Sequence, residues 1–134
     1  MGLSPIAMFR RLRAPLTNNF WSWGAVRDDG TVFLRVWEDE RQPRDGKQLI
    51  RLINHAAYAD NAENHGYRER LRHLQLIKEG APAFLVLCRT VDKHSQPREI
   101  ASFDQRDVLR LGAVQLIDGD EWGEITGRVK ATAA

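Results

Sequence analysis

The sequence predicts an α+β protein built on a small, strongly bent, mainly antiparallel β-sheet or barrel of about seven strands, with two flanking helices. Short apolar segments separated by turn residues predict the strands. Only two stretches show helical periodicity. The expected order of helix, three strands, helix and four strands does not alternate as a doubly wound parallel sheet requires.

The length and composition predict one folded domain. The chain has 134 residues, of which 43% are hydrophobic and 28% are charged. These values are typical of a globular protein and argue against disorder. We expect a single domain over 1–134, with an N-terminal helical arm at 1–17, a barrel-like body at 18–130 and a frayed tail at 131–134.

The sequence offers no signal for export or for membrane insertion. No apolar run is long enough to span a bilayer, and the arginines near the start follow its short apolar stretch instead of preceding it. We therefore expect a cytoplasmic protein without a membrane partner. The single cysteine, Cys88, lies in the apolar run AFLVLC, which predicts a buried, unreactive thiol and no disulfide.

Two helices are predicted from caps and spacing. The first covers 4–13, with Ser4 as its N-cap and Pro5 at the first helical position. The second covers 67–79, carries an apolar stripe and ends at Gly80. Asp104 is expected to cap a further helical turn.

The strands are predicted between these helices and the turn signals. The charged segment 38–47 reads as an exposed loop, and Asp118-Gly119-Asp120 reads as the turn of a late hairpin. The predicted strands cover 20–27, 31–37, 47–53, 83–91, 98–103, 113–117 and 122–129.

The first hairpin suggests a binding surface. A two-residue type I′ turn at Asp29-Gly30 would place Ser22 opposite Trp37 and Gly24 opposite Arg35. Small residues facing large ones leave a hollow that could take a planar ring by stacking and hydrogen bonding. The opposite face is expected to be core, and it would carry Trp21, Trp23, Ala25, Val32, Leu34, Val36 and Glu38.

Two alternatives remain open for this surface. The helix at 67–79 could cover it and fill the hollow with leucines, or a shift of one residue in register could exchange the two faces. Further candidates for ligand contact occupy the irregular segment after the third strand and the start of the second helix. They are Asn54, His55 and Tyr67.

Arginine clusters are candidates for contacts with a nucleic-acid backbone. The net charge is only +2, so each cluster could equally be a solvated surface. They become a nucleic-acid footprint if at least two flank the hollow. The candidates are Arg10, Arg11 and Arg13 in one cluster, Arg41, Arg44 and Arg51 in a second, and Arg68 and Arg72 in a third.

The sequence shows no catalytic or metal-binding motif. HExxH, GxSxG, GxGxxG and P-loop patterns are absent, so no metal, cofactor or catalytic residue is expected. A nucleic-acid-binding module is therefore favoured. One alternative is a small enzyme acting on nucleic acid or nucleotides, with Glu38, Asp39 and His65 as acid–base groups. Another is a protein–protein interaction module or self-associating homodimer that uses the same tryptophan surface.

This organisation resembles the PUA-like group of domains, which includes the SRA, EVE, YTH and ASCH modules. The resemblance is topological and covers most of the chain: a small bent barrel with helices at its side and an aromatic-lined pocket. The opening strand typical of EVE domains is absent. The resemblance implies recognition of a flipped or modified base in DNA or RNA, or of a nucleobase-like small molecule.

Overall fold

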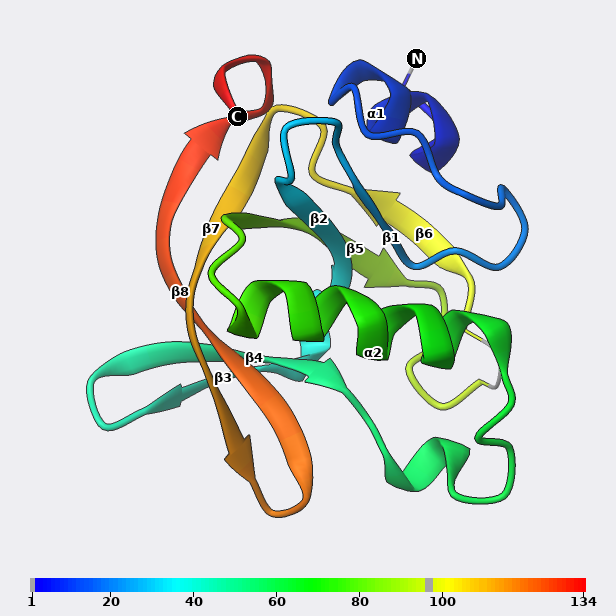
Figure 1. The fold of residues 1–134 in the computed structure, drawn as a ribbon, viewed down its shortest axis with the longest axis vertical. Helices are drawn as coiled ribbons and strands as arrows, with labels where there is room; N and C mark the ends of the chain where they lie inside the picture. The colour runs from blue at the N-terminus through cyan, green and yellow to red at the C-terminus, as the bar shows by residue number, and fades with distance from the viewer. Residues whose placement is uncertain (1, 96–97) are drawn as a thin grey trace.

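The computed structural model describes residues 2–95 and 98–134 and confirms the α+β class (Figure 1). The described residues form two α-helices, α1 (Pro5–Arg11) and α2 (His65–Lys78). Eight strands form one mixed sheet. They are β1 (Gly24–Val26), β2 (Val32–Trp37), β3 (Arg41–Arg44), β4 (Lys47–Ile53), β5 (Ala83–Thr90), β6 (Ile100–Phe103), β7 (Asp107–Ile117) and β8 (Asp120–Lys130).

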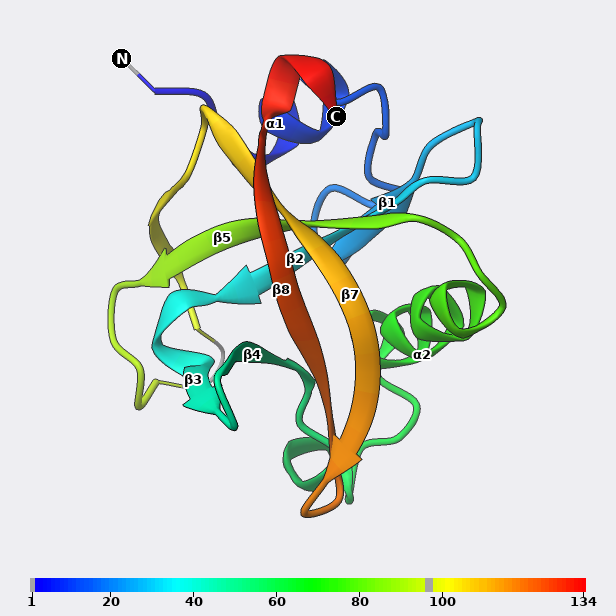
Figure 2. The same ribbon diagram turned by 90° about the vertical axis from the view of Figure 1, so that its left-hand side faces the viewer.

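The sheet is open and strongly bent, so the expectation of a barrel is not met as a closed structure. Its order is β1-β2-β5-β7-β8-β4-β3, with β6 paired to β5. All neighbouring strands are antiparallel except β2 and β5, which run parallel. Shifts in register within the β7–β8 and β4–β8 pairs are bulges that bend a sheet. Figure 2 shows β7 and β8 as a long curved ribbon that crosses β2 and β5.

Both faces of the sheet are covered. On one face α2 packs through Leu74 onto buried residues of β2, β4, β5 and β7. On the other face α1 packs through Met8 and Phe9 onto Phe33, Val86 and neighbouring residues. The expected N-terminal arm is therefore part of the core. At the other end of the chain, where a frayed tail is expected, Ala131–Ala133 forms a 3-10 turn whose first residue is buried beside α1.

The helix predictions are confirmed with small shifts. The Ser4 hydroxyl accepts a hydrogen bond from the N–H of Ala7 at 3.1 Å, as an N-cap should. Asn64 caps α2 in the same way, and Gly80 follows the helix with a positive φ of 109°.

Among the described residues, no helix is both long and apolar enough to cross a membrane.

Two segments adopt strand structure that the sequence analysis did not predict. β3 lies within the expected loop 38–47, which folds as a 3-10 turn followed by a hairpin. The hairpin closes at Asp45-Gly46, where φ is 51° and 78°, as a type I′ turn requires. After Asp104, β7 begins at Asp107 in place of the expected helical turn.

The register of the first hairpin differs by one residue from the expected one. Gly24 pairs with Leu34 and Ala25 with Phe33. Only Gly30 has a positive φ, whereas a type I′ turn needs two such residues, so the loop contains three residues, 28–30, instead of two. The predicted strand 20–27 also shortens to Gly24–Val26.

This shift exchanges the faces of β1 relative to β2. Gly24 now shares a face with Leu34 in the α2 core, while Ala25 joins Phe33 in the α1 core. Since both faces are packed, the expectation of one core face and one open face is wrong.

The buried thiol of Cys88 is confirmed, and burial raises its pKa to about 12.

Candidate functional site

A cavity of about 570 Å³ lies beside the end of β2, and both Arg35 and Trp37 border it as predicted. The end of β4, the 3-10 turn Ala56–Tyr58 and the start of β6 supply other walls. Leucines of α2 do not line it. Its aromatic lining residues are Phe20, Trp23, Trp37 and Tyr58, and its arginines are Arg35, Arg51, Arg70 and Arg98.

The aromatic wall is a connected series of rings. The Tyr58 ring lies 5.3 Å from Trp23 and stacks on Tyr67 at 4.9 Å, measured between ring centroids. Trp23 fits against α2 because Gly66 has no side chain there; a Cβ at that position would overlap the indole. These contacts hold two flat side chains at the edge of the cavity, where a planar ligand could stack on them.

Arg70 is a structural clamp at the base of the cavity. It is only 3% exposed, and its guanidinium donates hydrogen bonds to the carbonyl oxygens of Leu52, Trp23 and Arg35. It thereby joins α2 to β2, to β4 and to the segment before β1. Burial, together with the nearby charge of Arg35, lowers the pKa of Arg70 to about 10.

Two of the other arginines are neutralised by acidic side chains. Arg98 bonds Asp39 at 2.8 Å and lies over the Trp37 ring, 5.4 Å from its centroid. Arg51 forms ion pairs with Glu40 and with Asp120. Both guanidinium groups therefore have little capacity left for an anionic ligand.

Arg35 differs from these arginines because its guanidinium has no hydrogen-bond or ion-pair partner among the described residues. Burial lowers the pKa of Arg35, which means that its charge is held at a cost. A ligand with an anionic group or two adjacent acceptor atoms would relieve that cost through paired N–H donors.

The secondary candidates lie together beside the cavity. Asn54 lines it, whereas His55 and Tyr67 stand behind its wall. The Nδ1 of His55 lies 2.6 Å from the Tyr67 hydroxyl, and its Nε2 lies 3.3 Å from a carboxylate oxygen of Glu121. This chain of polar groups supports Tyr67, on which Tyr58 stacks.

Ser22 and Gly24 do not belong to the cavity, which corrects the prediction. Ser22 is 3% exposed, and its hydroxyl contacts Glu69 at 3.4 Å and accepts the N–H of Asn18 at 3.0 Å. A Cβ on Gly24 would overlap the backbone of Phe33. The hollow is therefore formed by the end of β2 and by loops, and not by small residues within the hairpin.

The predicted backbone-contact arginines are dispersed. Arg51 lines the cavity but is paired, and Arg68 bonds the exposed Glu63 at 2.8 Å. Arg72 is exposed on α2. The remaining candidates, Arg10, Arg11, Arg13, Arg41 and Arg44, lie on or just after α1 or on β3 and do not line the cavity.

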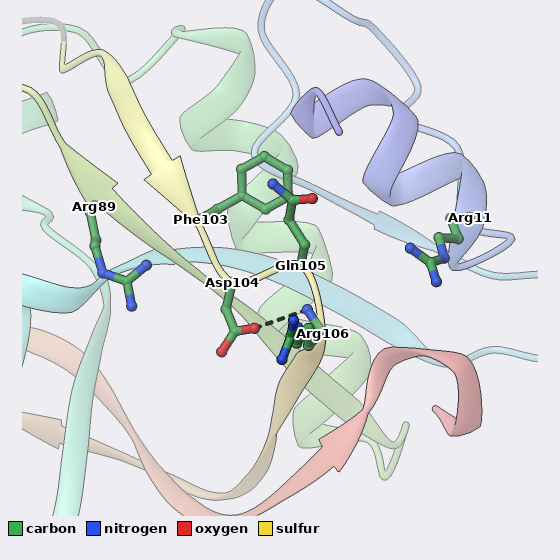
Figure 3. Close-up of a pocket in the computed structure, with 6 residues that line it drawn as sticks. All are labelled: Arg11, Arg89, Phe103, Asp104, Gln105 and Arg106. Atoms are coloured by element: carbon green, nitrogen blue, oxygen red, sulfur yellow. Dashed lines mark hydrogen bonds between the residues drawn. The ribbon is translucent and has the colours of Figure 1, made fainter. Parts of the chain in front are cut away.

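A second, more open depression of about 660 Å³ contains Arg11, Arg89 and Arg106 around the turn between β6 and β7. Figure 3 shows that Asp104 lies between Arg89 and Arg106, while Arg11 stands apart on the α1 side. Arg89 also pairs with Glu38 at 3.0 Å. The arginines of this depression therefore do not converge on one point.

The acid–base candidates of the enzyme alternative each contact a different partner. Glu38 pairs with Arg89, Asp39 pairs with Arg98, and His65 packs against Trp21 with 5.2 Å between ring centroids. No group of three or more His, Cys, Asp or Glu side chains suited to a metal ion occurs in the described part of the chain.

Sequence reasoning missed several lining residues. Trp23 was expected in the core but is half-buried and borders the cavity, and Tyr58 lay in a segment without clear periodicity. Arg70 was hidden among the arginines of α2. The one available signal was its position on the helix, one turn before Leu74 and therefore on the buried side. Arg98 could not be placed without the tertiary structure.

Comparison with protein-family models, with curated proteins and with solved structures found no match to this chain.

Proposed function

We propose that the protein is a nucleic-acid-binding module that takes a flipped or modified base into the cavity beside β2. Trp23, Tyr58 and Trp37 would contact the faces or edges of the base, and Arg35 would donate hydrogen bonds to its acceptor atoms. The likeness to PUA-like domains is part of this proposal: the bent sheet and flanking helices support it, although the sheet is open.

The guanidinium of Arg35, which has no hydrogen-bond or ion-pair partner in the described part of the chain, is the observation that carries the proposal. Two neighbouring arginines already have partners: the terminal nitrogens of Arg70 donate to carbonyl oxygens, although its Nε has no partner, and Arg98 is paired with Asp39. A free, half-buried guanidinium beside aromatic rings matches a planar ligand with acceptor atoms better than it matches an apolar peptide.

Titration with fluorescently labelled DNA and RNA oligonucleotides at several salt concentrations tests the proposal. Binding that engages phosphates should weaken linearly on a log–log plot as salt rises, with a slope of about −0.7 per phosphate contact for a single strand. Arg35→Gln should weaken binding by about tenfold, since one paired guanidinium contact to a base contributes about 1–3 kcal/mol.

The matched control is Lys130→Gln, which removes a positive charge from an exposed position on β8. It should change affinity much less than Arg35→Gln does. Equal effects of the two variants would show that only net charge matters. Salt-independent or absent binding to every oligonucleotide, combined with concentration-dependent dimerisation, would favour the self-association alternative.

A further inference from the structure

Phe20 is an exposed aromatic residue at the mouth of the cavity. It is 98% exposed, the highest value among the large exposed hydrophobic side chains of the described residues, and it also borders the cavity. Leaving a whole phenylalanine ring in water forgoes the stabilisation that burial would give. A ring in this position contributes nothing to core packing, and what sets it apart from a single exposed apolar residue is its place at the cavity mouth.

The turn that carries Phe20 is held by several hydrogen bonds. The side-chain oxygen of Asn18 accepts the backbone N–H groups of Phe20 at 2.8 Å and of Trp21 at 3.3 Å. The Ser22 hydroxyl accepts the N–H of Asn18 at 3.0 Å, and the Ser22 N–H donates to the Asn18 carbonyl at 3.1 Å. Phe20 is thus presented on a turn closed from both ends.

Helix α2 supports this turn from below. The buried carboxylate of Glu69 contacts the Ser22 hydroxyl, and the Trp21 ring packs against His65 at the first position of the helix. Arg68 and Arg72 follow His65 at helical spacing and are exposed, but Arg68 is paired with Glu63. Arg72 therefore supplies a cationic side chain on the helix face next to the turn, where it could contact a phosphate beside an inserted ring.

We infer that Phe20 is a wedge: it enters the base stack of a duplex and fills the space left when a base turns into the cavity. This inference rests on the proposed function. Proteins that unstack a duplex commonly insert an apolar side chain between base steps, which offsets part of the stacking energy lost. Phe20 has the position for this role because it is next to the cavity, fully exposed and fixed at its backbone.

A comparison of duplex and single-strand binding tests the wedge. The probes are a duplex with one mismatched pair, which is cheaper to open than a matched pair, and the single strand of the same sequence. Phe20→Ala should weaken duplex binding by about tenfold and leave single-strand binding unchanged, because a single strand has no paired stack to open. Phe20→Leu should restore part of the duplex affinity.

Leu116→Ala is the matched control, because Leu116 is also apolar and 71% exposed but lies near the end of β7 and does not border the cavity. Leu116→Ala should leave both the duplex and the single-strand affinity unchanged.

A 2-aminopurine at the mismatched position supplies a second measurement. Its fluorescence should rise when wild-type protein extrudes it from the stack, and should rise less with Phe20→Ala.

The outcomes separate this inference from the proposed function. Equal weakening of duplex and single-strand binding by Phe20→Ala would overturn the wedge and make Phe20 another wall of the cavity. Unchanged duplex binding, or wild-type binding to single strands alone, would also overturn the wedge while leaving the base-binding proposal standing. Failure of the wild-type protein to bind either probe would overturn both.

Discussion

The cavity beside β2 and the open depression at the β6–β7 turn have similar volumes, about 570 and 660 Å³, and both contain arginines. They differ in what surrounds the arginines. Arg35 is half-buried beside aromatic rings, and its guanidinium has no hydrogen-bond or ion-pair partner among the described residues, whereas Arg11 and Arg106 lie exposed in the depression. Burial beside aromatic rings, more than the number of arginines, therefore distinguishes a ligand site from a polar surface.

The largest expected difference between the two regions concerns stability. Arg70→Met removes donors from three carbonyl oxygens, one of them in a fully buried hydrogen bond, and should lower the free energy of unfolding by about 3–5 kcal/mol, measured by urea denaturation. Arg106→Met, in the exposed depression, should change it by about 0.5 kcal/mol or less. Similar values for the two variants would mean that Arg70 is not a clamp.

Buried groups on α2 and the carboxylate of the depression should respond to acid in different pH ranges. His73 lies on α2 three residues after Arg70, and burial followed by the charges of Arg70 and Arg72 lowers its pKa to about 4. The unfolded chain takes up this proton near the ordinary pKa of about 6.5, so stability should fall by about 2 kcal/mol between about pH 7 and pH 5. Burial raises the pKa of Glu69, which offsets part of this loss.

Asp104 gives the contrasting case in the depression. Although burial raises its pKa, the N–H groups of Asp107 and Arg106 and the Arg128 side chain lower it overall. Its stabilisation is present above the unfolded pKa and is lost only as pH falls below it. His73→Leu should remove the loss of stability between about pH 7 and pH 5 that is attributed to His73. If stability still falls in this range, another group is responsible for the loss. His94→Asn, at an exposed histidine, is the control.

The smallest expected effect concerns a paired arginine of the cavity. Arg98→Gln should weaken oligonucleotide binding by about twofold, compared with about tenfold for Arg35→Gln, because Asp39 already neutralises Arg98. Arg106→Gln should have an effect no larger than that of Arg98→Gln. Fluorescence anisotropy at fixed salt measures all three, and an equal loss for Arg35 and Arg98 would remove the distinction on which the comparison depends.

Local signals predicted much of the fold. The Ser4 cap, the Gly80 terminus and the strand at 47–53 depend on residues close in sequence, and each is present in the structure. The hairpin expected across Asp118-Gly119-Asp120 is also present, but its turn is shorter, with Asp118 and Gly119 at positive φ and Asp120 as the first residue of β8. The parallel pairing of β2 with β5 had no local signal, because it joins segments separated by two strands and a helix.

The site was predicted only in part, and the reason is the register of one hairpin. An Asp-Gly pair fits a two-residue loop and also a three-residue loop, and the chain uses the second at Gly30. Arg35 and Trp37 line the cavity as predicted because both lie on β2, whereas Ser22 and Gly24 lie on packed surfaces and do not line it. Trp23 and Tyr58 take their place through tertiary contacts that spacing does not reveal.

The most direct test of a base-binding cavity is an NMR titration that follows the arginine side-chain Nε–Hε resonances as a single-stranded oligonucleotide is added. We predict a large shift of the Arg35 resonance and little change at Arg106, because Arg35 is half-buried beside aromatic rings with no partner for its guanidinium among the described residues, whereas Arg106 is exposed in the open depression. A stationary Arg35 resonance, with shifts at Arg11 and Arg106 instead, would contradict the account and move the binding site to the open depression.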